Sequence, residues 1–347
     1  MQRDGASTAW HLASAQAKAF ALAALVAITV FALLLAAAGK DPLRAYADTL
    51  VYVFGNAYGF SELLVRMTPL VFTAVAVALP ARIGLINVGG EGQLYMGACL
   101  ATAGALALPD QPAFVLLPLL VVLGFIGGGL WALVPGVLRA LHLVNETIST
   151  LLLNYVAPLI VSYLIFGPWR DPQSSFYPQS PAFADAARLP SFLQSRVHAG
   201  LLLALACLAL YWFVTARTRF GLDMRAIGGN PEAARRLGIP VLGYILAVMF
   251  AAGGIAGLAG MAEVTAIQGR LVSELSPGYG FVGFLVSWLA RTTAGGILAM
   301  AFLFAVTSSV GDILQITQGL PFAVVNILMA VILFIVLGRQ PARSAGR

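Results

Sequence analysis

The chain has 347 residues, of which 60% are hydrophobic and only 10% are charged. Soluble globular domains have about half apolar and about a quarter charged residues, so this composition excludes an ordinary soluble enzyme and indicates an integral membrane protein. The net charge of +6 would suggest nucleic-acid binding in a soluble protein, but here the basic residues lie in short segments between apolar runs, which is typical of membrane topology. We therefore expect contact with membrane lipid and no nucleic-acid partner.

Apolar runs long enough to cross about 30 Å of hydrocarbon recur along the chain. We predict about ten membrane-spanning helices, at approximately 19–39, 63–81, 92–108, 113–138, 147–167, 199–215, 241–261, 278–290, 295–311 and 320–338. The first run could be mistaken for a secretory signal, but about twenty apolar residues exceed the roughly 7–15 of a signal core. The predicted fold is thus an all-α polytopic membrane protein with a single transmembrane domain over 19–338.

The basic residues predict which side of the membrane each loop faces. Most of the 20 Lys and Arg residues fall on the side of the N-terminus when ten spans are counted. Because Lys and Arg are enriched in cytoplasmic loops, we expect both termini in the cytoplasm, with tails at 1–18 and 339–347. The loop 216–240 is then cytoplasmic. The long loop 168–198 is external, where it is either a surface for an extracytoplasmic partner or a plain solvated loop.

The segment 84–97 places polar side chains among glycines between two apolar runs, at Asn87, Glu91, Gln93 and Tyr95. A carboxylate at membrane depth faces a partner, a cavity or a pathway, and irregular backbone is tolerated where it lines one. Transporters also use interrupted helices to build sites near the bilayer midplane. We therefore predict a broken helix whose polar residues line a substrate pathway. The alternative is that Glu91 only caps a helix starting near Gly92, paired with Arg66 or Arg82.

Two pairs of glycines, at 124 and 128 and at 253 and 257, have the GxxxG spacing. This spacing lets two helix backbones approach each other closely. It predicts tight helix packing in these two spans.

A second polar cluster opens the predicted span 147–167, and comprises Asn145, Glu146, Thr147, Ser149, Thr150, Asn154 and Tyr155. Asn145 suits a helix cap with Glu146 in the first turn, which accounts for both residues without a function. Asn154 lies about two turns further on and must find hydrogen-bond partners, either on neighbouring helices or in a permeating polar molecule. Asn145, Glu146 and Asn154 are therefore further candidates for the substrate pathway.

The stretch 221–240 is polar in a chain that is otherwise apolar. It predicts a short helix over about 231–237, with Asn230 as its cap, Pro231 at its first position, Glu232 at its positive end, Arg235 and Arg236 at its negative end, and Gly238 ending it before Pro240. A helix of about two turns is not stable alone in water. We expect it to dock on a cytoplasmic partner.

Several kinds of chemistry find no support in the sequence. Cys99 and Cys207 lie in separate apolar runs without CxxC spacing, and the three histidines are scattered, so we predict neither a metal site nor a disulfide. Lys18 and Lys40, which are the lysines of the chain, do not lie in a GxxxxGK[ST] phosphate-binding loop, and the HExxH and GxSxG motifs are missing. We expect no catalytic residues, no cofactor and no ATP site in this chain, and hence a transport role.

Four stretches carry a resemblance to a known family. They are the run from Arg225 to Ala234 with Gly238-Ile239-Pro240, the segment 84–97, the run from Asn145 to Tyr155, and Gly319-Leu320-Pro321. The first resembles the EAA-type coupling loop of ABC importer permeases, which docks into a groove of the ATPase subunit. Together the four resemble the nucleoside-type permeases of the ribose and branched-chain amino acid permease superfamily, over nearly the whole chain.

The resemblance implies a set of partners in a bacterial inner membrane. These are an ATPase subunit that holds ATP and Mg, a second permease subunit, identical or different, and an extracytoplasmic substrate-binding lipoprotein that delivers a nucleoside. It also implies that ATPase coupling rests on Arg225, Asn230, Pro231, Glu232, Ala233, Ala234, Arg235 and Gly238. The run from Leu289 to Gly296 departs from the Gly-Arg and His-Pro or Asn-Pro pattern of the family.

Alternatives remain open at this point for both substrate and class. Within the family reading, the substrate is otherwise a simple sugar such as a pentose, or a branched-chain amino acid. From a different class, an autonomous channel or ion-coupled carrier would also lack an ATP site and use broken helices.

Overall fold

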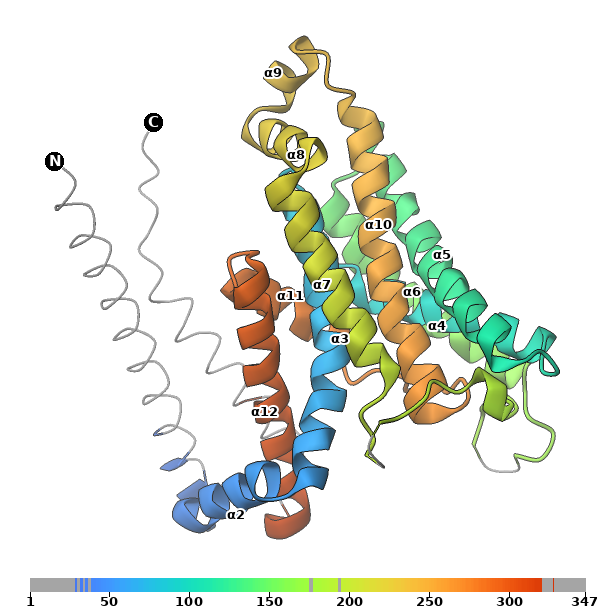
Figure 1. Cartoon of the computed structure of the whole chain (residues 1–347), viewed down its shortest axis with the longest axis vertical. Coiled ribbons are helices and arrows are strands. Elements are labelled where there is room, and N and C mark those ends of the chain that lie inside the picture. The colour runs from blue at the N-terminus through green and yellow to red at the C-terminus, as the bar shows by residue number, and fades with distance from the viewer. Residues whose placement is uncertain are drawn as a thin grey trace, which may run out of the picture. The chain divides into compact units, whose positions relative to one another are not determined.

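The computed structural model describes residues 39–174, 177–192 and 195–319, together with residues 29, 32, 33, 35, 36 and 327 (Figure 1). The chain divides into two units, one of residues 61–305 and the other of residues 1–60 with 306–347. The predicted tails 1–18 and 339–347 lie outside the described residues, as do nearly all of the predicted span 320–338 and most of the span 19–39.

All regular elements among the described residues are helices, and only isolated bridges pair Gln179 with Val272 and Ser191 with His198. In chain order they are α2 (Pro42–Gly55), α3 (Ala57–Ala81), α4 (Gly90–Ala107), α5 (Ala113–Ala140), α6 (Glu146–Phe166), the 3-10 turn η1 (Asp185–Ala187), α7 (Ala199–Arg217), α8 (Arg219–Gly229), α9 (Pro231–Arg236), α10 (Val241–Ala262), the π-helix η2 (Glu263–Gln268), α11 (Tyr279–Leu289) and α12 (Ala294–Gln318). The all-α prediction is confirmed for these residues.

Six helices in the described part of the chain are long and apolar enough to cross a membrane. They are Ala57–Ala81, Ala113–Ala140, Glu146–Phe166, Ala199–Arg217, Val241–Gln268 and Ala294–Ile313. The predicted spans 92–108 and 278–290 form α4 and α11, but α11 has only 11 residues and is therefore about 16 Å long, well short of the hydrocarbon thickness. Ten spans thus stays a prediction.

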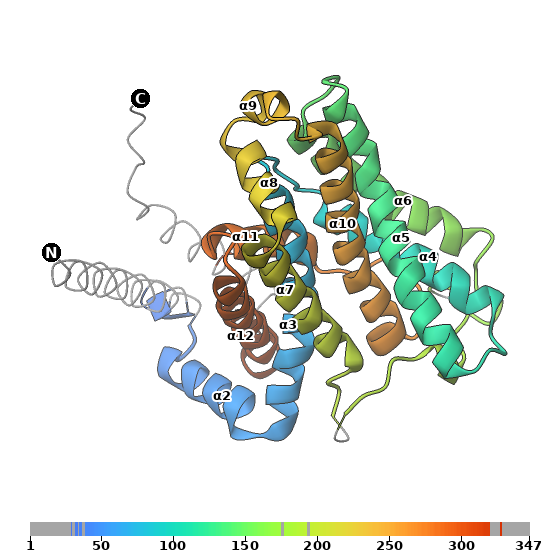
Figure 2. The same ribbon diagram turned by 45° about the horizontal axis from the view of Figure 1, so that its top comes forward.

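Glycines let α4, α5 and α10 pack backbone against backbone in the unit 61–305. A Cβ atom on Gly128 would overlap the carbonyl oxygen of Gly253, and one on Gly257 would overlap that of Gly124. A Cβ on Gly97 would collide with the backbone of Gly257 in the same way, which brings α4 into the contact. The two GxxxG pairs therefore face each other, as their spacing predicts, and Figure 2 shows α4, α5 and α10 together.

Two helices were not predicted from the sequence. The first, α2, begins where Asp41 accepts hydrogen bonds from the amides of Leu43 and Arg44, with Pro42 at its first position. The second, α8, begins where Thr218 accepts a hydrogen bond from Gly221. Both are short and carry local start signals of the usual kind, but neither is apolar enough to register as a span.

Candidate functional site

The polar residues of 84–97 surround the start of α4, where eight residues of irregular backbone separate it from α3. Asn87 is fully buried, and its side-chain amide pairs reciprocally with that of Gln93, at 3.1 Å from Asn87 Nδ2 to Gln93 Oε1 and 2.9 Å from Gln93 Nε2 to Asn87 Oδ1. Asn87 also donates to the carbonyl of Ala76 and accepts from the amide of Gly89. Because each amide end has a partner, the pair holds the loop against α3.

Asn154 reaches this loop from α6. Its Oδ1 accepts from the amide of Gly92 and its Nδ2 donates to the carbonyl of Val88, both at 2.8 Å, and the residue is 3% exposed. The hydroxyl of Thr150 accepts from the amide of Val88. The partners of Asn154 are therefore backbone groups at and just before the start of α4. Of the two kinds of partner that the sequence allowed, a neighbouring helix or a permeating molecule, the structure shows the first.

Glu91 joins the starts of two helices. Its carboxylate accepts from the amide of Gly280, in the first turn of α11, at 2.7 Å, and the residue is 5% exposed. A carboxylate is favourable at the positive end of a helix, and Glu91 lies in the first turn of α4 as well. Position 280 requires glycine, because the Cβ of any other residue would overlap the backbone of Glu91. The helix begins at Gly90, two residues earlier than the sequence alternative placed it.

Arg82 was one of the two basic partners considered for Glu91, and this pairing is wrong. Its guanidinium donates to the hydroxyl of Tyr211 at 2.9 Å and to the carbonyl of Thr292 at 2.8 Å. The Tyr211 hydroxyl donates to the same carbonyl. Arg291 and Thr292 both have positive φ, at 50° and 54°, so a strained turn between α11 and α12 is fastened to the end of α3 and to α7.

Tyr95 extends the site toward the segment before α11. Its hydroxyl donates to the carbonyl of Ser273 at 3.3 Å and accepts from the amide of Ser276 at 3.4 Å. Ser276 in turn accepts from the amides of Gly278 and Tyr279 through its Oγ. The start of α4 and the start of α11 are therefore connected by side chains as well as by Glu91.

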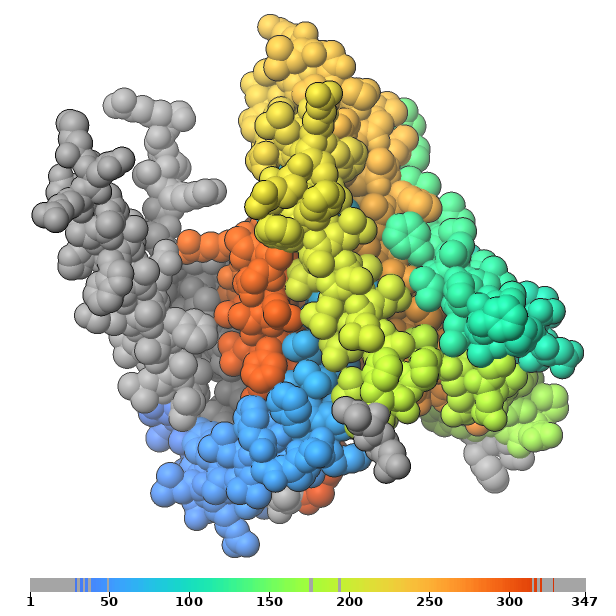
Figure 3. Space-filling model, viewed as in Figure 1, coloured from blue at the N-terminus to red at the C-terminus, as the bar shows by residue number. Residues whose placement is uncertain are grey.

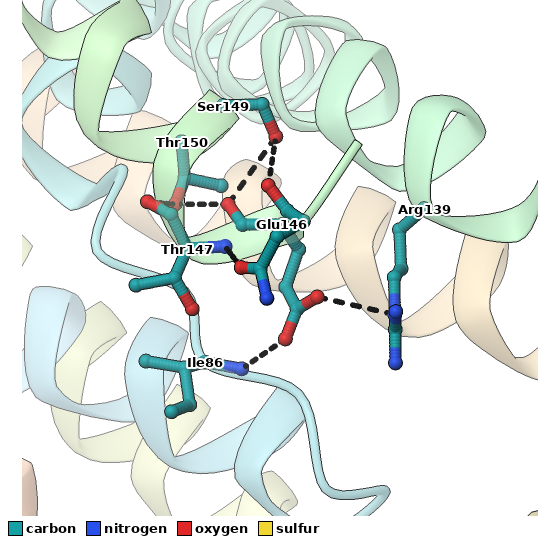
Figure 4. A network of polar contacts seen from close by, with 7 residues as sticks. Ile86, Arg139, Glu146, Thr147, Ser149 and Thr150 are labelled. Carbon is teal, nitrogen blue, oxygen red and sulfur yellow. Dashed lines mark hydrogen bonds and ion pairs between the residues drawn. The ribbon is translucent and has the colours of Figure 1, made fainter. Parts of the chain in front are cut away.

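The cluster at the start of α6 is a structural network (Figure 4). Asn145 caps the helix by accepting from the amide of Thr147 at 2.8 Å, as predicted. Glu146 is 4% exposed, with one carboxylate oxygen accepting from the amide of Ile86 and the other 3.1 Å from Nε of Arg139. The ion pair ties the end of α5 to α6. From the sequence, Arg139 was considered only as one of the basic residues that set the membrane topology, because its partner Glu146 lies on the next helix.

Apart from Asn145, which caps α6, the predicted pathway residues lie at the start of α4, in the loop before it, or on α6 facing that loop. Asn87, Glu91, Gln93, Asn145, Glu146 and Asn154 all direct polar atoms at protein groups. Such a buried network holds irregular backbone in one conformation inside a membrane. Whether these residues also line the pathway stays a prediction.

The predicted short helix is present as α9, Pro231–Arg236. Asn230 accepts from the amides of Glu232 and Ala233 at 3.0 Å each, and Gly238 ends the helix with φ of +83°. Glu232 lies 3.9 Å from Arg235 and 3.5 Å from Arg236. The local signals therefore set the helix as the sequence predicted.

Most of α9 is exposed. Within this helix, all of which the structure describes, Ala234 alone is buried, and Leu237, which follows it, is 78% exposed. The helices α8 and α9 lie beyond the end of α7 in Figure 1, and their side chains form the surface at the top of Figure 3.

Arg225, another of the residues predicted for coupling, binds within the chain. Its Nη1 donates to the carbonyl of Thr215, which lies two residues before α7 ends at Arg217. Further along α8, Gly228 lies so close to Arg82 that a Cβ would overlap the Arg82 carbonyl oxygen. The exposed α9 is therefore connected through α8 to Arg82, and from there to Tyr211 and the strained turn at Thr292.

Comparisons with known proteins cover nearly the whole chain. Residues 59–337 match the family described as the branched-chain amino acid transport system permease component. The chain is 38% identical to the glucose ABC transporter permease protein TsgB13 of Haloferax volcanii, over 91% of this chain and 86% of that protein. It is 32% identical to the guanosine ABC transporter permease protein NupP of Bacillus subtilis, over 93% of each, and 29% identical to the nucleoside ABC transporter permease protein NupB of Lactococcus lactis, over 88% and 86%.

Proposed function

Since this chain belongs to the family of branched-chain amino acid transport system permease components, we propose that it carries nucleosides into the cytoplasm as the permease subunit of an ABC importer. The family and the six apolar helices of the described residues make it a multi-pass membrane protein with a transport role. We place it in the plasma membrane of a bacterium, with both termini in the cytoplasm and about ten spans.

The observation that carries the mechanism is the exposed, capped helix α9. In our proposal it docks on an ATPase subunit, which holds ATP and Mg and drives the cycle. Glu232, Arg235 and Leu237 are exposed there, whereas Ala234 is buried against the rest of the protein. A helix of six residues needs such a partner, because its own hydrogen bonds are too few to hold it.

The contacts of α8 supply a route from α9 to the spanning helices. Movement of α9 displaces Gly228, which lies against Arg82, and Arg82 binds Tyr211 of α7 and the Thr292 turn between α11 and α12. Because well-packed elements move as rigid bodies and not by gradual deformation, a push at α9 repositions the end of α3, α7 and the turn between α11 and α12 together. A second permease subunit and an extracytoplasmic substrate-binding lipoprotein complete the importer that we propose.

Two substrates follow from the relatives. Nucleosides come first, because two relatives named for guanosine and nucleosides match almost the whole chain and because the segments 84–97 and 145–155 resemble the nucleoside-type permeases. A simple sugar is the second candidate. It is supported by the relative named for glucose, which is 38% identical to this chain. Both are uncharged, hydroxylated solutes, whereas a branched-chain amino acid, the remaining alternative, is a zwitterion.

The coupling proposal is tested by substitutions on the exposed face of α9. We expect Glu232→Arg and Ala233→Trp each to reduce co-purification of the ATPase subunit and to abolish uptake into proteoliposomes. Ala113→Trp is the matched control, since Ala113 is an exposed alanine outside both α9 and the loop 168–198. Undiminished co-purification and uptake by both α9 variants would refute the docking role, and uptake without any ATPase would favour an autonomous carrier.

The substrate proposal is tested on the binding protein that co-purifies with the complex. Ligands stabilise a protein by mass action, so the true substrate raises its melting temperature. We expect guanosine or another nucleoside to do so at low concentration. A response to glucose alone, or to leucine alone, would replace the nucleoside by the second or third candidate.

A further inference from the structure

A charged cavity of about 460 Å³ lies in the unit 61–305, and the residues that line it include Ser276, which contacts Tyr95 of α4. It opens between the first turns of α3, the π-helix η2, the segment 274–279 and the residue Arg196. Its charged lining comprises Glu62, Arg66, Arg196, Glu263 and Glu274. The volume falls in the range of about 300–1,000 Å³ that small-molecule sites occupy.

Glu263 is the residue that most requires an explanation. It is 5% exposed, it lines the cavity, and it belongs to the apolar segment Val241–Gln268. A carboxylate in such a segment is costly and typically marks a substrate or ion pathway. It also begins the π-helix Glu263–Gln268, and π-helical turns occur frequently at functional sites because they redirect side chains.

The opposite wall is held by an ion pair. Nη1 of Arg196 lies 3.0 Å and 3.1 Å from the two carboxylate oxygens of Glu62. This contact joins α3 to the end of the loop 168–198, which our topology places outside the membrane. The cavity therefore lies at the extracytoplasmic end of the unit, where a binding protein releases its cargo.

The lining matches a neutral, hydroxylated ligand. A carboxylate only accepts hydrogen bonds and a guanidinium only donates them, whereas each hydroxyl does both. Glu263 and Glu274 beside Arg66 therefore offer adjacent acceptors and donors to neighbouring hydroxyls. Tyr279 and Pro277, which also line the cavity, supply an apolar surface for a ring.

We infer that this cavity is a binding site for the vicinal hydroxyls of the transported solute, with Glu263 and Arg66 as its polar contacts. The inference rests on the proposed function and deepens it, because a ribose and a hexose share this chemistry. Guanosine and glucose, after which two of the relatives are named, both carry neighbouring hydroxyls. A zwitterionic amino acid with an aliphatic side chain lacks the paired hydroxyls.

Cysteine labelling tests occupancy of the cavity without relying on turnover. Gln268 lines the cavity and is exposed, so Gln268→Cys, with Cys99 and Cys207 replaced by alanine, is modified by a charged thiol reagent added outside. The complex with its ATPase and binding protein is labelled in proteoliposomes. We expect guanosine, or glucose if that is the substrate, to slow labelling at least about fivefold, and 2′,3′-dideoxyguanosine, which lacks both ribose hydroxyls, to leave the rate unchanged.

Uptake by two carboxylate variants completes the test. Glu263→Gln keeps the size of the side chain but weakens its acceptors, and should raise the KM for uptake about tenfold or more. Asp110→Asn is the matched control, an exposed carboxylate outside both the cavity and the loop 168–198, and should change KM less than about twofold. The binding of the ATPase, measured by co-purification, should be unchanged in both.

The outcomes separate this inference from the proposed function. Wild-type uptake with unprotected labelling, or with an unchanged KM in a folded Glu263→Gln complex, overturns the inference alone. Equal protection by guanosine and its dideoxy analogue overturns the assignment to hydroxyls. Uptake of neither guanosine nor glucose by the wild-type complex overturns the proposed function and this inference with it. If Glu263→Gln does not assemble, the labelling result decides.

Discussion

Replacing Asn154 by leucine distinguishes a structural amide from one that serves the permeating solute. The side chain makes two hydrogen bonds of 2.8 Å, to the amide of Gly92 and the carbonyl of Val88, and it is 3% exposed. Leucine has a similar volume but no polar atoms. The substitution therefore leaves two buried backbone groups without the partner that α6 supplies.

The magnitude follows from where these backbone groups lie. A buried group left unpaired costs about 1–3 kcal/mol, although interhelical hydrogen bonds in membranes average only about 0.6 kcal/mol because groups find other partners. Gly92 is in the first turn of α4 and Val88 precedes the helix, so neither has a replacement within a helical ladder. We expect Asn154→Leu to lower the free energy of unfolding by about 2–4 kcal/mol.

The assay is reversible denaturant unfolding of the purified permease in mixed micelles, followed by tryptophan fluorescence. Tyr155→Leu is the control, because Tyr155 is the next residue on α6 and is 65% exposed; it should change stability by less than about 0.5 kcal/mol. An Asn154→Leu protein of unaltered stability that no longer takes up substrate would refute the structural reading and assign the amide to the pathway.

Three further predictions concern packing, capping and pH. Gly257→Ala should destabilise by about 1–3 kcal/mol in the same unfolding assay, because its Cβ overlaps the Gly124 carbonyl, whereas Gly243→Ala, with open space around it, should be neutral or slightly stabilising. Asn230→Ala should cost α9 about 1 kcal/mol and speed amide hydrogen exchange over residues 231–237 several-fold. Burial, and then the nearby charge of Arg196, lowers the pKa of His198 to about 4; stability should therefore be complete above the unfolded pKa of about 6.5 and fall as the pH drops toward 4.

Each of these has an outcome that contradicts it. Equal stability of the two glycine variants would mean that α5 and α10 separate at little cost. Unchanged exchange in Asn230→Ala would mean that the cap does not hold α9. For pH, His198→Asn keeps a side-chain acceptor for the Gly200 amide without a titrating group, so it should flatten the dependence between pH 7 and 5. A dependence identical to that of the wild type would place the titration elsewhere.

Local signals were read from the sequence with good accuracy. The helix α9 was predicted over 231–237 and is found at Pro231–Arg236, because its cap, its proline and its terminal glycine act within a few residues of one another. The cap at Asn145 is confirmed for the same reason. The helices α2 and α8 were missed although Asp41 and Thr218 cap them, because neither is apolar enough to register as a span.

Partners far apart along the chain were beyond the reach of the sequence. A basic partner, Arg66 or Arg82, was one alternative for Glu91, whereas its carboxylate binds the amide of Gly280, 189 positions away. Asn154 and Gly92 are 62 positions apart. The charged cavity escaped notice because Glu62, Arg196 and Glu263 come from three separate segments, although a carboxylate inside an apolar run was a signal that could have singled out Glu263.

The sequence by itself determined that this protein spans a membrane, that its regular structure is helical, and that a capped polar helix interrupts the apolar runs. Composition, periodicity and capping are local properties, and hydrocarbon leaves the backbone few ways to satisfy its hydrogen bonds. Only the tertiary structure decided which glycines face each other, which amides hold the start of α4, and which charges share a cavity. These depend on long-range packing, where many polar partners are chemically equivalent and geometry selects among them.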